Sequence, residues 1–513
     1  MQRTHRYIYA LMVVTFVTRI ILAFRPELKL TERPYQEDSF YMFGCAAQLA
    51  AGNGFSIDGE NPTNGVQPLV VLLYAPFFKI AGDDRWLGLR LTFILVGLLE
   101  ALCVYVIYRL VSQLGKDRGL AERSALVAAL LWTTLYTLLV HDANGLETGL
   151  LATLYLLVLW RYTLMVQRPD RSLRSEILLG CLLGLLVLAR IDAAIFVSLL
   201  LAVELIRGRF SSQTFVRCVV LGVCSLLVSA PWWIYNLTQF GSLMPISGQS
   251  ESIESLVHVN LYTTPQTIGD ILTVMFYSGY DLYAPSLSVA WGALMLLIWI
   301  ALFWVTKLHR KIPQTFDLRP LLPLFLTGIV LAIYYTFFFS APHFISRYLH
   351  PLRIGVLLVF AMLLPMLIDW IRGQRSLTLR RVMQFGGIAV LLLAAFFNTA
   401  VYLRAFTTDK TPPVHYAGLY AQKVAPEKVG MTSSGTASFI AQNVVNLDGK
   451  VNADALKARK QDRLGEYVVE ANINYIADWK DMCEKIAREA ARVGATYSVV
   501  DSLGPIFVYK RFR

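Results

Sequence analysis

Runs of about 20 apolar residues recur along the chain, and no other feature limits the fold so strongly. A helix needs about 20 such residues to cross the roughly 30 Å of hydrocarbon in a bilayer. A membrane barrel would show alternating segments of about ten residues instead, and this sequence has no such pattern. Only 16% of the residues are charged, against about 25% in soluble domains. The chain is therefore predicted to be a polytopic α-helical membrane protein.

Walking along the sequence gives about eleven transmembrane helices. They are expected near residues 7–25, 87–110, 124–141, 145–165, 176–190, 193–207, 214–236, 286–306, 320–340, 348–371 and 381–404. The fifth and sixth segments are short and are separated by Arg190 and Asp192, so they could be broken helices. Residues 68–81 are too short to span comfortably and are expected to form a juxtamembrane or re-entrant helix. Arg19 lies in the first span, where it could snorkel or pair with a loop carboxylate.

The basic residues predict the orientation. Lys and Arg gather near the N-terminus and in alternate loops, such as 116–123 and 372–381, and the positive-inside rule places these in the cytoplasm. Loops 26–67 and 238–285 and residues 405–513 then lie together on the periplasmic (extracytoplasmic) face of the cell (inner) membrane. Topology thus explains much of the net charge of +12. The sequence shows no motif for binding nucleic acid.

Two units are expected. Residues 1–404 form the transmembrane module, and residues 405–513 form a soluble extracytoplasmic domain. Short apolar runs at 497–500 and 506–509 and a charged helical stretch at 480–492 favour an α/β fold for the second unit. Reaction chemistry is expected on this outer face, because the cytoplasmic side offers only short connectors.

The first outer loop carries an acidic pair, Glu37-Asp38, followed by Ser39-Phe40-Tyr41. An acidic pair just beyond a span is ordinarily a solvated loop, and neither it nor the Gly-rich turns that follow would support an activity alone. The aromatic residues Phe40 and Tyr41 could dock the loop onto the membrane surface.

Several short motifs nevertheless recur in the order found in one family. They are Glu37-Asp38-Ser39-Phe40, Gly54-Phe55, Asn64-Gly65-Val66-Gln67-Pro68-Leu69, Asn144-Gly145-Leu146-Glu147-Thr148, Leu188-Ala189-Arg190-Ile191-Asp192, Pro231-Trp232-Trp233, Gly241-Ser242-Leu243-Met244-Pro245, Arg347-Tyr348-Leu349-His350-Pro351 and Asn446-Leu447-Asp448-Gly449-Lys450-Val451-Asn452. With these motifs the chain resembles the GT-C superfamily of membrane glycosyltransferases, which take sugars from polyprenyl-phosphate carriers. Within it, the chain is most similar to bacterial arabinofuranosyltransferase-like proteins.

The resemblance implies an inverting transfer of a sugar, such as the pentose arabinofuranose, to a glycan, lipid or protein acceptor. Such a site needs a carboxylate to take the acceptor's proton and donors or cations to hold the phosphate. Asp38 is the expected base, with Glu37 as its rival. Arg347, His343 and Arg190 are the expected phosphate ligands, and the first two would share a face if helical.

Supporting roles are expected for Glu147, Asp192 and Gln67, with Asp192 orienting Arg190. The chain departs from many relatives at Gly44, where they carry a basic residue, and at Gln67, where they carry Ser or Thr. The first departure puts in doubt an electrostatic partner for the acidic pair. A divalent metal is used by some relatives, but no ligand set here demands one.

Two other classes of function stay open. A flippase or transporter for lipid-linked sugars would also need polar groups in its spans, although it would show inverted repeats that this sequence lacks. A non-catalytic membrane protein that binds glycan would not require Asp38. In the glycosyltransferase reading, residues 405–513 are expected to position the acceptor.

Overall fold

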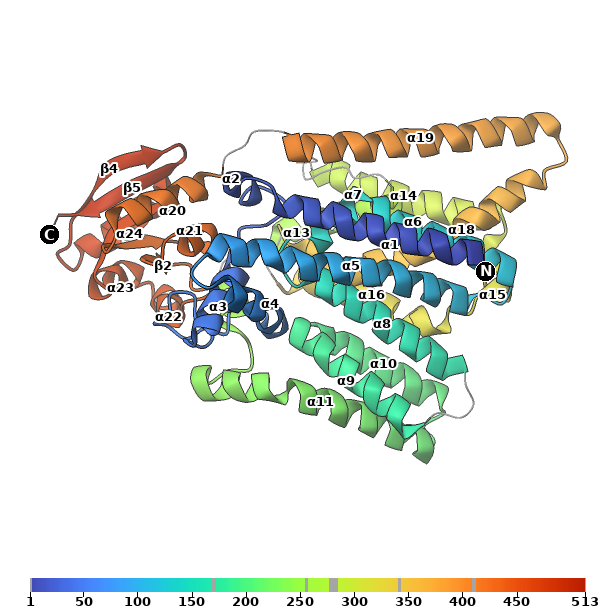
Figure 1. Cartoon of the computed structure of the whole chain (residues 1–513), viewed down its shortest axis with the longest axis horizontal. Coiled ribbons are helices and arrows are strands. Elements are labelled where there is room, and N and C mark those ends of the chain that lie inside the picture. The colour runs from blue at the N-terminus through green and yellow to red at the C-terminus, as the bar shows by residue number, and fades with distance from the viewer. Residues whose placement is uncertain are drawn as a thin grey trace.

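The computed structural model describes residues 2–167, 172–253, 257–275, 285–339, 343–407 and 412–512. A bundle of helices leads into a smaller unit with a β-sheet at the C-terminal end (Figure 1). The long helices are α1 (Gln2–Ala23), α5 (Arg85–Leu114), α6 (Arg118–Thr134), α8 (Thr148–Gln167), α11 (Ser212–Phe240), α14 (Pro285–Val305), α16 (Leu322–Phe337), α18 (His350–Arg372) and α19 (Leu377–Thr407). The shorter ones are α2 (Glu27–Leu30), α3 (Ser39–Ala51), α4 (Pro68–Ala81), α7 (Tyr136–Asp142), α9 (Leu173–Ala189), α10 (Ala193–Arg207), α12 (Ile246–Glu251), α13 (Val257–Thr273), α15 (Leu308–Thr315) and α17 (Ile345–Tyr348), with a 3-10 turn at Arg319–Leu321.

The eleven predicted spans are confirmed in part. Within the described residues, eight helices are long and apolar enough to cross a membrane, or nine if α6 and α7, bent by 64°, form one broken span. Every predicted segment contains helix, but α9 and α10 have only 17 and 15 residues, which is about 26 and 22 Å of helix. α9 ends because Arg190 adopts an extended backbone. The predicted short apolar helix at 68–81 is confirmed as α4.

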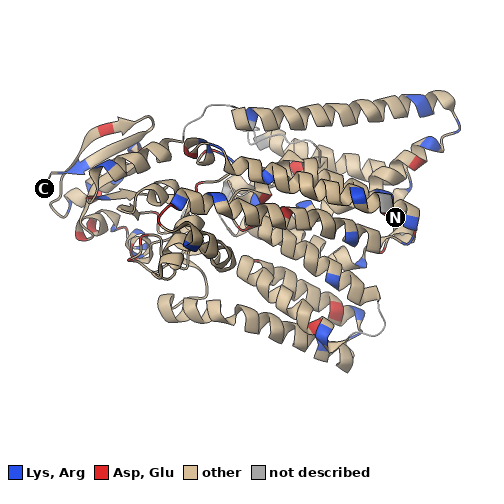
Figure 2. Ribbon diagram, viewed as in Figure 1, with Lys and Arg blue, Asp and Glu red and all other residues tan. Residues whose placement is uncertain are grey.

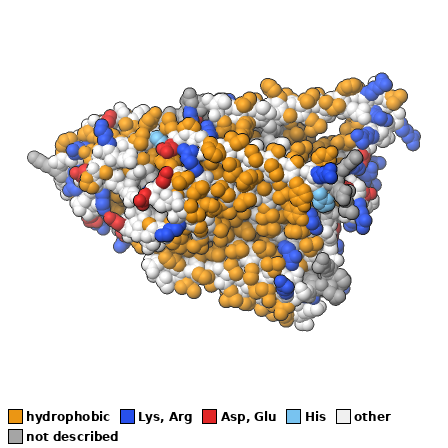
Figure 3. Space-filling model, viewed as in Figure 1, with side chains coloured by type: hydrophobic (Ala, Val, Ile, Leu, Met, Phe, Trp, Pro, Cys, Tyr) orange, Lys and Arg blue, Asp and Glu red, His pale blue; other side chains and the backbone are white. Residues whose placement is uncertain are grey.

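The surface of the bundle is that of a multi-pass membrane protein. A broad hydrophobic band covers the helical part (Figure 3). In α14 and α19 only 11% and 6% of the apolar window is buried inside the protein, as expected for side chains that face lipid. Many Lys and Arg residues lie at the end of the bundle remote from the sheet (Figure 2). This arrangement agrees with the alternation of basic loops in the sequence.

Ionic groups inside the bundle tie distant helices together. Arg19 is 1% exposed and its Nη2 lies 3.7 Å from Glu100 Oε2, so it neither snorkels nor reaches a loop carboxylate. Trp132 Nε1 donates to the same carboxylate oxygen at 3.1 Å. His350 Nε2 lies 3.0 Å from Asp142 Oδ1. Removing one partner of a buried ion pair such as Arg19–Glu100 typically costs about 3–5 kcal/mol, so this pair holds α1 against α5. The His350–Asp142 contact joins α18 to α7.

The C-terminal unit is a five-stranded mixed sheet covered by helices. Its strands are β1 (Lys428–Met431), β2 (Val444–Asn446), β3 (Ile473–Trp479), β4 (Tyr497–Leu503) and β5 (Ile506–Arg511), in the order β2-β1-β3-β5-β4. Its helices are α20 (Pro413–Val424), α21 (Gly435–Ile440), α22 (Ala453–Lys460), α23 (Leu464–Glu470) and α24 (Lys480–Ala491). β1 is parallel to β2 and β3, whereas β5 is antiparallel to β3 and β4.

Each face of this sheet has its own apolar core, because successive side chains of a strand point to opposite faces. Along β3, Ile476 packs into a cluster with residues of α23 and α24. Its neighbours Tyr475 and Ala477 pack into a second cluster with residues of α20 and α21. The α/β character expected for residues 405–513 is therefore visible in this three-layer arrangement.

The first outer loop docks onto this unit, and the expected docking of its aromatic residues onto the membrane surface is wrong. Phe40 is fully buried, with its ring centroid 5.4 Å from that of Phe439 in α21. Asn446 Nδ2 donates to Tyr41 Oη at 3.2 Å. The apolar core of the helical bundle thus continues into the C-terminal unit through Phe439.

Candidate active site

A cavity of about 370 Å³ lies at the ends of the spanning helices next to the C-terminal sheet. Its walls come from the first outer loop, the turn between α9 and α10, the α16–α17 region, the segment around α12 and the loop after β2. Six of the eight predicted site residues line it: Asp38, Gln67, Glu147, Arg190, Asp192 and Arg347. Segments separated by hundreds of residues therefore meet in one polar chamber.

Asp38 faces a lysine that was not among the predicted site residues. Lys450 Nζ lies 3.6 Å from Asp38 Oδ1 and 2.7 Å from Glu251 Oε1. Burial alone would lower the pKa of Lys450, but the carboxylates of Asp38, Asp448 and Glu251 outweigh it and hold that pKa well above its usual value. The lysine is therefore a permanent cation within the cavity.

Hydrogen bonds to the backbone of the loop after β2 position this lysine. Gly449 N donates to Asn446 Oδ1 at 3.0 Å, and Lys450 N donates to Asp448 Oδ1 at 2.8 Å. On the facing loop, a Cβ added at Gly65 would lie 1.7 Å from the carbonyl oxygen of Lys450. Only glycine allows this close approach, which explains why the Asn64-Gly65 motif and the Asn446–Asn452 motif occur together.

Glu37 points away from the cavity. Its Oε1 accepts a hydrogen bond from Thr436 N at 2.9 Å, and its Oε2 accepts one from Thr436 Oγ1. Burial raises the pKa of Glu37 to about 7, although the bonds from Thr436 oppose the shift. A Cβ added at Gly435 would lie 2.3 Å from the Glu37 carbonyl oxygen. Glu37 therefore joins the first outer loop to α21, and Asp38 is the member of the acidic pair that reaches the cavity.

Arg190 is held by carboxylates on two sides. Its Nε and Nη2 donate to the two oxygens of Asp192 at 2.8 and 2.7 Å, and its Nη1 donates to Glu147 Oε1 at 2.9 Å. Tyr335 Oη donates to Asp192 Oδ2 at 2.8 Å. Asp192 thus orients Arg190, and most of the guanidinium's donors are already occupied.

Arg347 has hydrogen-bond donors that are not used within the described part of the chain. Its Nε and Nη1 are buried and make no hydrogen bond within the described part of the chain. Its Cζ lies 5.3 Å from the centre of the Tyr348 ring, and the Arg190 Cζ lies 4.2 Å from the same ring. Buried donors without partners are costly, so Arg347 has two donors available to a ligand in the cavity.

His343 does not share a helical face with Arg347, because α17 begins only at Ile345. The His343 side chain is exposed and does not line the cavity. The cations that line the cavity are therefore Arg347, Lys450 and the partly committed Arg190.

Solved structures with the same architecture identify the fold. The chain is similar to ArnT from Cupriavidus metallidurans bound to undecaprenyl phosphate, with a TM-score of 0.55 and 15% identity over 97% of each chain. It is also similar to the Archaeoglobus fulgidus oligosaccharyltransferase, with a TM-score of 0.56 and 12% identity over 98% of this chain and 74% of that one. The chain has the GT-C fold.

Other comparisons add less. A family model described as dolichyl-phosphate-mannose-protein mannosyltransferase matches residues 62–235. The arabinofuranosyltransferase AftD from Mycobacteria matches with a TM-score of 0.45 and 15% identity, over 97% of this chain and 39% of that one, and no argument rests on so distant a likeness. The comparison with curated protein sequences gave no match. The expected resemblance to GT-C proteins is thus confirmed at the level of the fold.

Sequence reasoning missed several groups that complete this GT-C cavity: Lys450, Glu251, Tyr335 and Tyr348. Lys450 supplies the electrostatic partner for Asp38 that the glycine at position 44 cannot provide. The signal was present in the Asn446–Asn452 motif, whose only cation is Lys450. Among the described residues, no group of three His, Cys, Asp or Glu side chains is placed to hold a metal ion.

Proposed function

We propose that this protein is a glycosyltransferase that moves a sugar from a polyprenyl-phosphate donor to an acceptor hydroxyl at the outer face of the membrane. One observation carries the proposal: a carboxylate, Asp38, and a guanidinium with unpartnered buried donors, Arg347, line the same cavity. The GT-C fold supports it, since a protein with this fold was solved bound to undecaprenyl phosphate. The carboxylate can take the proton of the acceptor hydroxyl, and the guanidinium can hold the phosphate of the donor.

In the proposed reaction, the acceptor oxygen attacks the anomeric carbon while the bond to the phosphate oxygen breaks. Asp38 takes the acceptor's proton as general base. The lipid phosphate leaves as an anion and needs no acid, unlike the alcohol expelled by a glycosidase. Arg347 and Lys450 stabilise the negative charge that moves onto the phosphate. A single in-line displacement of this kind inverts the anomeric configuration.

The remaining residues take positioning roles in this proposal. Glu147 and Asp192 fix Arg190, whose guanidinium lies over the Tyr348 ring and contributes positive potential to the phosphate site. Gln67, which precedes α4, offers a hydrogen bond to the sugar. His343 does not line the cavity and is given no role in this proposal.

We further propose that residues 1–404 act as the catalytic module in the inner membrane and residues 405–513 as a periplasmic unit that supplies Lys450 and positions the acceptor. The sugar is proposed to be a pentose such as arabinofuranose, on the motif resemblance described above. No divalent metal is assigned a role.

An assay with synthetic polyprenyl-phosphate sugars tests the function. The purified protein in lipid nanodiscs is given donors that carry radiolabelled arabinofuranose or mannose, together with envelope glycan, lipid and peptide acceptors. Transfer should occur with at least one donor and should depend on Asp38. A flippase would instead move the donor across vesicles without forming product, and a glycan-binding protein would bind acceptor equally well after Asp38→Asn. Either result without transfer contradicts the proposal.

A further inference from the structure

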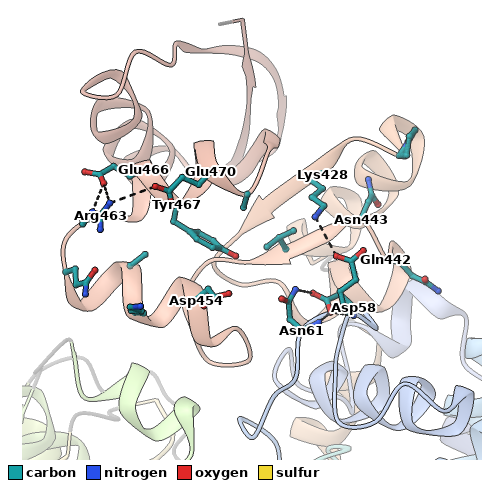
Figure 4. A pocket seen from close by; sticks show the side chains of 17 residues that line it. Asp58, Asn61, Lys428, Gln442, Asn443, Asp454, Arg463, Glu466, Tyr467 and Glu470 are labelled. Atoms are coloured by element: carbon teal, nitrogen blue, oxygen red, sulfur yellow. Dashed lines mark hydrogen bonds and ion pairs between the residues drawn. The ribbon is translucent and has the colours of Figure 1, made fainter. Parts of the chain in front are cut away.

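A second cavity, of about 680 Å³, lies between the first outer loop and the C-terminal unit (Figure 4). One wall is the turn formed by Asp58, Glu60 and Asn61, and the other is built from β1, β2, α22 and α23. The turn is rigid, because Asp58 accepts hydrogen bonds from its own neighbours, including Asn61 Nδ2 at 2.7 Å. Lys428 Nζ lies 3.7 Å from Glu60 Oε2 and joins the two walls. The two walls are therefore in contact at the edge of the cavity.

The chemistry of its lining suits a neutral ligand rich in hydroxyl groups. Much of its charge is already paired, for example Arg463 with Glu466 and Glu470, and carboxylates outnumber cations around it. These facts argue against a phosphate or another polyanion. The side-chain amides of Gln442 and Gln461 are exposed at the cavity, and with no hydrogen bond to another group within the described residues they face solvent or a ligand. An amide both donates and accepts, as a sugar hydroxyl does.

An aromatic ring lies at the centre of this lining. Figure 4 shows Tyr467 projecting between α22 and the strands. Asn452 Nδ2 donates to its hydroxyl at 2.8 Å and fixes the ring. A fixed aromatic ring beside free amides can pack against the apolar C–H face of a sugar while the amides bind its hydroxyls.

The second cavity is linked to the first by short stretches of chain on both walls. Asn61 lines the second cavity and Gly65 lines the first. On the other wall, Asp454 lines the second cavity and Lys450 lines the first. Four extended residues span at most about 14 Å, so the two cavities are close neighbours. An acceptor held in the second cavity would therefore lie close to the cavity that Asp38 lines.

We propose that this second cavity is the acceptor subsite and that the acceptor is a neutral oligosaccharide or polysaccharide chain. The proposal rests on the glycosyltransferase function proposed above and names its acceptor class. It assigns Tyr467 as the ring that stacks on the acceptor, with Gln442 and Gln461 as hydroxyl ligands. These are specificity residues and take no part in breaking the donor bond.

Binding of defined oligosaccharides in nanodiscs tests this subsite without requiring turnover. The probes are mono-, di-, tetra- and hexasaccharides of arabinan, galactan and glucan, with a Ser/Thr-rich peptide as the competing class. For one glycan series, affinity should rise with chain length. Tyr467→Ala should weaken hexasaccharide binding about tenfold, as loss of one aromatic contact implies, and should leave monosaccharide binding unchanged.

Two variants serve as matched controls. Tyr467→Phe keeps the ring but loses the hydroxyl bonded to Asn452, so it should bind the hexasaccharide nearly as well as wild type. Tyr416→Ala removes a half-exposed tyrosine on α20, outside the cavity, and should change nothing. Asp38→Asn should keep the length dependence even though its transfer falls about 10²–10⁴-fold, which separates this proposal from the proposed reaction. Absence of length dependence in every series, unchanged affinity in Tyr467→Ala, or preference for the peptide overturns the subsite.

Discussion

Replacing the carboxylate of Asp38 is the most direct perturbation of the proposed reaction. Asp38→Asn keeps the size of the side chain and its capacity for hydrogen bonding but removes the proton acceptor. A positioned general base typically contributes about 10²–10⁴-fold to the rate, which is about 3 to 5 kcal/mol of activation free energy. We therefore expect kcat for transfer to fall by this factor.

The structure shows that stability should change far less than the rate. The Asp38 and Lys450 side chains are 22% and 21% exposed, and partly solvated ion pairs contribute about 0.2–1 kcal/mol. Lys450 also keeps its contact with Glu251 at 2.7 Å in the variant, so no cation is left without a partner. The loss of rate should therefore exceed any loss of folding free energy several-fold.

The assay measures single-turnover transfer and, separately, binding of the lipid donor to wild type, Asp38→Asn and Glu37→Gln. Donor affinity should be preserved in Asp38→Asn. Glu37→Gln should lose less activity, because Glu37 contacts Thr436 and does not reach the cavity. If Asp38→Asn transfers sugar at near the normal rate and Glu37→Gln is inactive, Glu37 is the general base and Asp38 is not. Activity in both variants would place the base elsewhere and refute the reasoning.

Three further predictions follow from the same geometry. Arg347→Lys should bind the donor less tightly than wild type, and Arg347→Ala less tightly still, since a guanidinium can hold two phosphate oxygens and an ammonium is a point charge. Equal donor affinity in wild type and both variants would make Arg347 an interfacial anchor. A reporter active only in the cytoplasm, fused after Arg513, should be silent, and activity would reverse the proposed orientation. The pKa values of Glu37 and Asp448 are raised to about 7 and about 6. The folded state therefore keeps protons that the unfolded chain releases. The two carboxyl groups contribute fully to stability below about pH 4, and this contribution is lost as the pH rises to 7. The thermal midpoint should accordingly fall between pH 5 and pH 8, and less steeply in Glu37→Gln; a midpoint that rises with pH by the same amount in both proteins would contradict this assignment.

The sequence by itself determined the membrane character and most of the helices, because burial in lipid demands long apolar runs whatever the rest of the chain does. It also singled out most residues of the cavity through short motifs in a fixed order. It did not determine how many of these helices cross the membrane, since apolar runs such as those on either side of Arg190 predict helix but do not fix its length or its bends.

Only the tertiary structure decided which of these residues meet. Glu37 and Asp38 are adjacent in sequence, yet their side chains face different neighbours, because Glu37 is bonded to Thr436 in a unit about 400 residues away. Lys450 reaches Asp38 from that same unit, through a loop that fits only against a glycine at position 65. Pairing across such distances depends on how whole units pack together, and local sequence patterns carry no record of that packing.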